Sequence, residues 1–245
     1  PQIRRPLDIT REMFGWGVGL IIIGLIKKAI ISDYISLNFV DRVFADPSLY
    51  SGVESLAAIY GYALQIYCDF SGYSDMAIGL ALLLGFRFPK NFDAPYKSAT
   101  ITEFWRRWHI SLSSWLRDYL YIPLGGNRVS KGRHIINIFA VWLFTGFWHG
   151  AAWNFIIWGV YFGLIVMIEK YTLLKVHDKI PSVFLHIYSM LLVIAGWGIF
   201  YFDNFDQMIV FFQAFFGNVA SLYDFVDESA LLDNFWLWIV ALFFC

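Results

Sequence analysis

The sequence predicts an all-α fold: a polytopic transmembrane helical protein with interfacial and re-entrant helices around a central cavity. Hydrophobic residues make up 59% of the 245 residues and charged residues only 15%, whereas a soluble domain carries roughly 25% charged residues. Aromatic residues reach 20%, which is typical of proteins with aromatic belts at both membrane interfaces. Apolar runs long enough to cross a bilayer recur along the chain.

Two of these runs, 14–31 and 183–202, predict complete spans of about 20 residues. A third run, 56–86, is long enough but is interrupted by the polar segment DFSGYSD. Residues 205–216 have the pattern of an interfacial helix, and a last apolar run begins at 235. We expect an internal piece of a longer polytopic protein.

Basic residues gather in one loop, 87–134, which contains nine Lys or Arg against three acids. Segment 169–182 adds three lysines, whereas 32–54 contains one Arg and 203–234 contains neither Lys nor Arg. Because Lys and Arg are enriched in cytoplasmic loops, the charges predict that 87–134 and 169–182 are cytoplasmic and that the other two loops lie outside.

The apolar run 135–168 carries His149 near its middle, flanked by glycines. Because the flanking segments 87–134 and 169–182 are both predicted to be cytoplasmic, this run crosses the membrane twice or not at all. We expect each half to be shorter than about 17 residues, the lower limit for a span, and therefore to form a re-entrant or broken hairpin with His149 near its turn. Irregular backbone at that depth is tolerated where it lines a cavity, so a cavity around His149 is expected.

A second histidine, His109, falls in a segment that predicts one amphipathic helix over 100–119. Thr100 followed by Glu103 forms a capping-box pattern. At about 100° per residue one face is apolar, which suits a helix in the membrane plane. The residues of that face are Ile101, Phe104, Trp105, Trp108, Leu112, Trp115, Leu116 and Tyr119.

Other site chemistries have little support in the sequence. The two cysteines form neither a metal spacing nor a disulfide framework. No third ligand is spaced to join the two histidines, so no metal site is predicted. The segment GYSDM is not a GxSxG nucleophile elbow, and a nucleic-acid-binding fold is not recognisable.

Three ordered segments carry a resemblance to a known family. They are DFSGYSDMAIGLALLLGFRFPKNFDAPY, FWRRWHISLSSWLRDYLYIPLGGNR and FTGFWHGAAWNFIIWG. Together they resemble the membrane-bound O-acyltransferase (MBOAT) family, and most closely its bacterial branch that acetylates alginate and peptidoglycan. The resemblance runs from about residue 71 to 159 and extends loosely over the rest, which implies a single membrane domain over 1–245.

The resemblance also implies which residues act. The histidine of the WHG segment, His149, corresponds to the catalytic residue, and His109 of the WRRWH segment to the second essential one. The aromatic and basic neighbours of the two histidines are candidate substrate-binding residues: Trp105, Arg106, Arg107, Trp108 and Trp148.

The implied reaction is O-acyl transfer, with acetyl as the expected group, without a bound cofactor and with acyl-CoA (acetyl-CoA) as co-substrate. Histidine suits a general base because its pKa of about 6.5 lies near operating pH, and an apolar cavity would keep His149 neutral. His109 would orient the donor or stabilise developing charge. The expected location is the bacterial plasma (inner) membrane, with several crossings. Expected partners are membrane lipid and an extracytoplasmic O-acetyltransferase or polysaccharide export and modification proteins.

Two other functions stay open at this point. The related branch of the family transfers D-alanine from a small carrier protein to teichoic acid, and the YIPLGGNR continuation looks more like the acetylating branch. A transporter or channel would use the polar groups to line a permeation path. Transporters commonly show a second, symmetry-related broken helix, and no such repeat is evident here.

Overall fold

The computed structural model describes residue 2 and residues 8–216. These residues are helices and connecting segments without a strand, which confirms the predicted all-α class. They form two compact units: one contains the described residues before Phe92 together with those from Ile209, and the other is Phe92–Met208. Each unit is described by itself, and the single domain over 1–245 stays a prediction.

The first unit begins with α1 (Arg11–Leu25), which continues through two π-helical segments and two short α-helices to Ala45. The predicted span 14–31 lies within this helix, but the loop expected from residue 32 is wrong. The chain stays helical until Asp46 and Pro47, where the backbone leaves the helical region. The intervening elements are η2 (Ile26–Ser32), α2 (Asp33–Ile35), η3 (Ser36–Val40) and α3 (Asp41–Ala45).

The next long helix, α4 (Gly52–Leu83), runs without a break through the DFSGYSD segment, contrary to the expected interruption. Its start is fixed by a capping box in which Ser51 and Glu54 satisfy each other's backbone N–H groups. The acidic groups of the segment find partners on η2 instead of breaking the helix. Lys27 pairs with Asp75 at 2.8 Å and Lys28 with Asp69 at 2.6 Å.

Helices α1 and α4 pack in antiparallel register through facing glycines. A Cβ on Gly24 would lie 2.5 Å from the carbonyl oxygen of Gly72, and one on Gly79 would lie 2.5 Å from that of Gly17. Only glycine permits so close an approach of two backbones. Gly19 on the same helix faces open space.

Gly24→Ala therefore separates this helix pair, and we expect a loss of roughly 1–3 kcal/mol, as for other overpacked interiors. Gly19→Ala is the matched control and should be neutral or slightly stabilising, because alanine is the better helix former. Thermal melting of the detergent-solubilised protein measures both. Equal melting temperatures for the two variants would contradict the close glycine packing.

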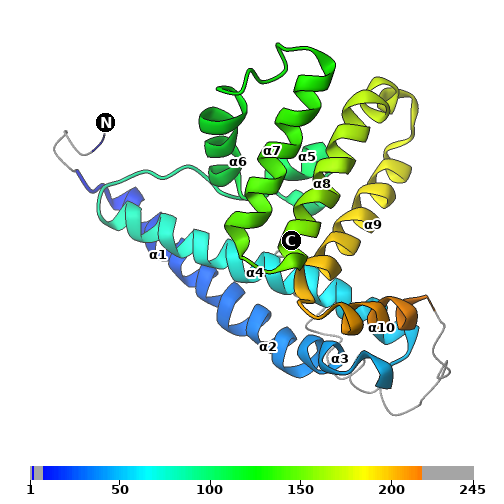
Figure 1. Ribbon diagram of the computed structural model, residues 1–245. Helices are drawn as coiled ribbons and strands as arrows, with labels where there is room; N and C mark the ends of the chain where they lie inside the picture. The colour runs from blue at the N-terminus through cyan, green and yellow to red at the C-terminus, as the bar shows by residue number, and fades with distance from the viewer. Residues whose placement is uncertain (1, 3–7, 217–245) are drawn as a thin grey trace. The chain divides into compact units, whose positions relative to one another are not determined.

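In the second unit the expected hairpin is present (Figure 1). Helix α7 (Lys131–His149) ends at His149, and α8 (Trp153–Tyr171) returns beside it. Each arm has 19 residues, so the expectation of half-helices shorter than 17 is wrong. The lysine-bearing segment that was expected as a loop from residue 169 begins inside α8. Helix α9 (Ser182–Tyr201) packs next to α8 and confirms the span predicted at 183–202.

The single amphipathic helix expected over 100–119 is wrong. The chain forms α5 (Ile101–Arg107), turns sharply, and forms α6 (Ile110–Leu116) followed by the π-helical turn η6 (Arg117–Tyr121). Thr100 caps Glu103 N as predicted, but the Glu103 carboxylate accepts from Ala99 N rather than from Thr100 N. Much of the expected membrane face is instead packed inside the unit: Ile101, Phe104, Trp108 and Leu116 are buried.

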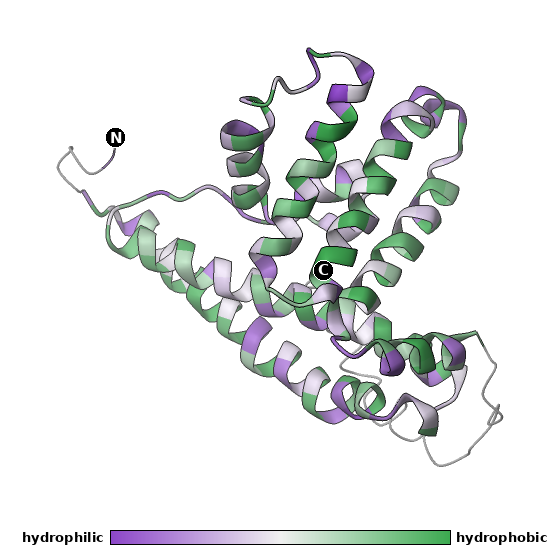
Figure 2. Cartoon of the chain, viewed as in Figure 1, coloured by the Kyte–Doolittle hydropathy of each residue, from purple (hydrophilic) through white to green (hydrophobic). Residues whose placement is uncertain are grey.

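Among the described residues, three helices are long and apolar enough to cross a membrane: Arg11–Ala45, Trp153–Lys175 and Ser182–Tyr201. Figure 2 shows that the hydrophilic residues of the second unit concentrate in the segments that connect its helices, while the helices themselves are largely hydrophobic. Residues 205–216 form α10 (Phe205–Phe215), as expected; its interfacial position stays a prediction. The span expected from residue 235 lies outside the described residues.

Candidate active site

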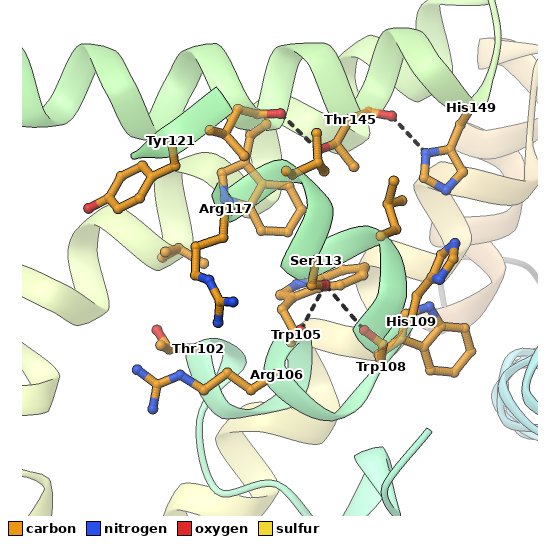
Figure 3. Close-up of a pocket in the computed structure, with 15 residues that line it drawn as sticks. Thr102, Trp105, Arg106, Trp108, His109, Ser113, Arg117, Tyr121, Thr145 and His149 are labelled. Carbon is orange, nitrogen blue, oxygen red and sulfur yellow. Dashed lines mark hydrogen bonds between the residues drawn. The ribbon is translucent and has the colours of Figure 1, made fainter. Parts of the chain in front are cut away.

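The two histidines, 40 residues apart in the sequence, line one cavity of about 240 Å³ in the second unit. His149 enters from the end of α7 and His109 from the turn between α5 and α6 (Figure 3). The fold therefore brings the two histidines together on one cavity. Apolar side chains such as Leu112, Val141 and Trp142 form much of the remaining wall.

The orientation of His149 is fixed by its own helix. Its ring Nδ1 lies 2.7 Å from the carbonyl oxygen of Thr145, one turn earlier. A carbonyl can only accept, so Nδ1 carries the hydrogen and Nε2 is the basic nitrogen. The ring of Trp158 packs edge-on against the imidazole at 4.9 Å between centroids, and that of Phe200 at 5.5 Å. This aromatic wall holds the imidazole in one position.

His109 occupies a backbone conformation that non-glycine residues rarely adopt, with φ of 48°. The turn is stabilised by the Ser113 hydroxyl, which donates to the carbonyl oxygens of Trp105 and Trp108. Burial, and to a lesser degree the neighbouring His149, lower the pKa of His109 from its ordinary 6.5 to about 4. His109 is therefore neutral over the physiological range and can donate or accept a hydrogen bond.

This shift has a measurable consequence for stability. Because the folded-state pKa is depressed, the unfolded chain binds the proton first, and the folded state loses stability as pH falls from about 6.5 towards 4. We expect His109→Gln, which removes the titrating group, to show a smaller drop in melting temperature between pH 7 and pH 5 than the wild-type protein. Identical pH dependence in both would show that His109 titrates normally.

The sequence-predicted binding residues divide into two groups. Trp105, Arg106 and Trp108 line the cavity with the histidines. Arg107 does not: its guanidinium pairs with Glu103 at 2.7 Å and donates to the carbonyl oxygen of Asp93. Trp148 lies outside the lining but packs against both imidazoles, with centroids 6.1 Å from His109 and 4.9 Å from His149.

The sequence did not predict most of the polar residues at the end of the cavity away from the histidines. Arg117 and Tyr121 line it together with Arg106, and Figure 3 shows these side chains at the end away from the histidines. A second cavity of about 230 Å³ shares Arg106 and Tyr121 and adds Lys170. None of the described residues lining either cavity is a carboxylate. On a continuous helix Arg117 would lie opposite the apolar face. The turn at His109 changes the direction of the chain, so that Arg117 reaches the cavity.

The geometry defines a membrane protein with an imidazole pair in an apolar cavity that is cationic at its far end. Comparison with known proteins gives the same class: the sequence profile of MBOAT, the membrane-bound O-acyltransferase family, matches residues 5–212. The chain belongs to this family, and its predicted location as a multi-pass membrane protein is confirmed.

Three relatives illustrate the range of the family. The chain is 45% identical to a probable alginate O-acetylase of Azotobacter vinelandii over 84% of its own length and 41% of that protein. It is 38% identical to a peptidoglycan O-acetyltransferase of Helicobacter pylori, over 87% of the chain and 41% of that protein. It is 32% identical to a teichoic acid D-alanyltransferase of Streptococcus thermophilus, over 69% of the chain and 43% of that protein. The chain thus spans about two fifths of these relatives.

Proposed function

We propose that this chain forms the reaction centre of an enzyme, an O-acetyltransferase of the bacterial inner membrane. The enzyme moves an acetyl group from a cytoplasmic thioester donor to an exported polysaccharide or to an extracytoplasmic transferase partner. The observation that carries the proposal is the pair His109 and His149 on one largely apolar cavity. The acetylating relatives, at 45% and 38% identity, support acetyl over D-alanyl transfer, where the identity is 32%.

The proposed step needs no covalent enzyme intermediate. Nε2 of His149 accepts the proton of an acceptor hydroxyl as its oxygen attacks the thioester carbonyl carbon. The carbon–sulfur bond of the resulting tetrahedral intermediate then breaks, and the imidazolium returns the proton to the departing thiolate. His109, neutral and adjacent, donates a hydrogen bond to the oxyanion. Protons balance within the cavity, so no relay to bulk water is required.

The cationic end suits the phosphates of an acyl-CoA. Arg106 and Arg117 line the first cavity and Arg106 and Lys170 the second. Arg117 is already paired with Asp118 at 2.7 Å, so Arg106 and Lys170 are the main cationic groups for a phosphate. Guanidinium groups are well matched to phosphate oxygens. A donor held there would extend its thioester towards the histidines. In this proposal the end faces the cytoplasm, in agreement with the charge distribution of loop 87–134.

The direct test is acyl transfer by the full-length protein in membrane vesicles supplied with labelled acetyl-CoA and, separately, with a D-alanyl carrier protein. We expect label to reach acceptor polysaccharide or partner only from acetyl-CoA. Transfer only from the carrier would assign the D-alanyl function, and solute uptake without transfer would assign a transporter. Cysteine labelling of loop 87–134 from outside the cell would reverse the proposed orientation.

The two adjacent arginines allow a matched comparison of the donor end. Arg106→Ala should raise the KM for acetyl-CoA by about tenfold, the effect of one charge-assisted phosphate contact of about 1.5 kcal/mol. Arg107→Ala removes the same charge from the same helix but outside the cavity, and should leave KM within about twofold. Steady-state kinetics at varied acetyl-CoA measure both. Equal changes in KM for the two variants would contradict the assignment of Arg106 to the donor site.

A further inference from the structure

A fully buried glutamate lies next to the cavity without lining it. Glu169, near the end of α8, is 0% exposed. Its Oε1 accepts from the backbone N–H of Ile101 at 2.7 Å, and its Oε2 accepts from the N–H of Thr102 at 2.7 Å and from the Thr102 hydroxyl at 2.6 Å. The hydroxyl of Tyr188 on α9 is a further partner.

Burying the Glu169 carboxylate costs free energy of desolvation, so its contacts point to a specific role. A buried carboxylate is tolerated only when hydrogen bonds replace its water, and three hydrogen bonds from α5 do so here. The first N–H groups of a helix have no partner within the helix. At α5 the Glu169 carboxylate takes two of them, and Thr100 takes that of Glu103. The start of α5 is thus fixed to α8 and, through Tyr188, to α9.

Helix α5 carries much of the cavity wall. Thr102, Trp105 and Arg106 line the cavity from its seven residues, and the left-handed turn at His109 follows directly. Moving the start of α5 moves all of these side chains relative to His149, which belongs to α7. Displacements near 1 Å in a reaction centre cost about a hundredfold in rate.

We propose that Glu169 is a positioning residue for acyl transfer, which sets the place of Arg106 and His109 relative to His149 by holding the first turn of α5. The inference rests on the proposed function of this cavity. Glutamine does not replace the carboxylate, because its NH2 group is a donor and would face either Ile101 N–H or Thr102 N–H, which are donors too.

The test compares Glu169→Gln with Glu54→Gln in the full-length protein. Glu54 is also a buried glutamate at a helix start, where it accepts from Ser51, but it belongs to the first unit. We expect both variants to melt at lower temperature. Per folded molecule, Glu169→Gln should reduce kcat/KM for acetyl transfer at least tenfold and move the acid limb of its pH profile towards 6.5, as His109 loses its enclosure. Glu54→Gln should leave both unchanged.

Glu169→Asp, which keeps the charge but shortens the side chain, is the second variant if the glutamine form does not fold. It should fold and transfer acetyl at least several-fold more slowly than wild type. Wild-type kinetics and pH profile in a folded Glu169→Gln or Glu169→Asp protein would overturn the positioning role while leaving the proposed function intact. Absence of transfer by the wild-type protein itself would instead overturn the proposed function.

Discussion

His149→Gln in the full-length protein should abolish acetyl transfer while leaving expression and membrane insertion intact. Glutamine keeps much of the size of histidine and a hydrogen-bonding group near Thr145, but it cannot accept a proton from an attacking hydroxyl. General-base assistance is typically worth about 10²–10⁴-fold, so a cellular acetylation assay should read near background. His149→Ala should fail equally.

The control is His177→Gln. His177 lies in a short 3₁₀ turn after α8, outside the cavity, where its ring contacts Leu174 and Asp178. Transfer by this variant should equal that of the wild-type protein. Normal transfer by His149→Gln would show that His149 is a structural histidine and that the base lies elsewhere.

The second large effect is expected at His109, where stability and activity should separate. His109→Gly removes the imidazole and also relieves a left-handed backbone that costs non-glycine residues about 1–2 kcal/mol. His109→Ala removes the imidazole but keeps the strain. We expect both to lose acetyl transfer by at least about 10²-fold, with the glycine variant melting at the higher temperature of the two.

Ala94 gives a control with the same backbone geometry, since its φ is 45°. Ala94→Gly should melt at or slightly above the wild-type temperature and transfer acetyl at the wild-type rate. Transfer by His109→Gly at a rate near wild type would show that the turn, and not the imidazole, is what the site requires.

The span at 183–202 was predictable from the length of its apolar run, and the turn at His149 from its flanking glycines and charged loops, although the arms of the hairpin are longer than expected. The break at His109 was not. Apolar residues keep helical spacing through Trp108, Leu112 and Leu116, so periodicity alone predicts one helix. The left-handed turn is imposed by tertiary packing, which buries Phe104 and Trp108 in the aromatic core around Trp197.

The same packing explains the part of the site that the sequence concealed. Arg117 contributes to the cavity only because α6 changes direction after His109. Glu169 reads in sequence as an ordinary acid beside Lys170 at a helix end, and nothing local indicates that its partners lie 67 and 68 residues earlier. The ion pairs of Lys27 and Lys28 are equally non-local.

The helix Arg11–Ala45 is longer than the thickness of a bilayer core. Its 35 residues would extend about 50 Å at 1.5 Å per residue, whereas the hydrocarbon core measures about 30 Å. The candidate spans of the second unit have 23 and 20 residues and match that core without adjustment. The longer helix must tilt steeply or project into the headgroup region. From its middle onward it carries Lys27, Lys28 and Asp33, so the part beyond the apolar stretch is suited to the headgroup region and to the water beyond it.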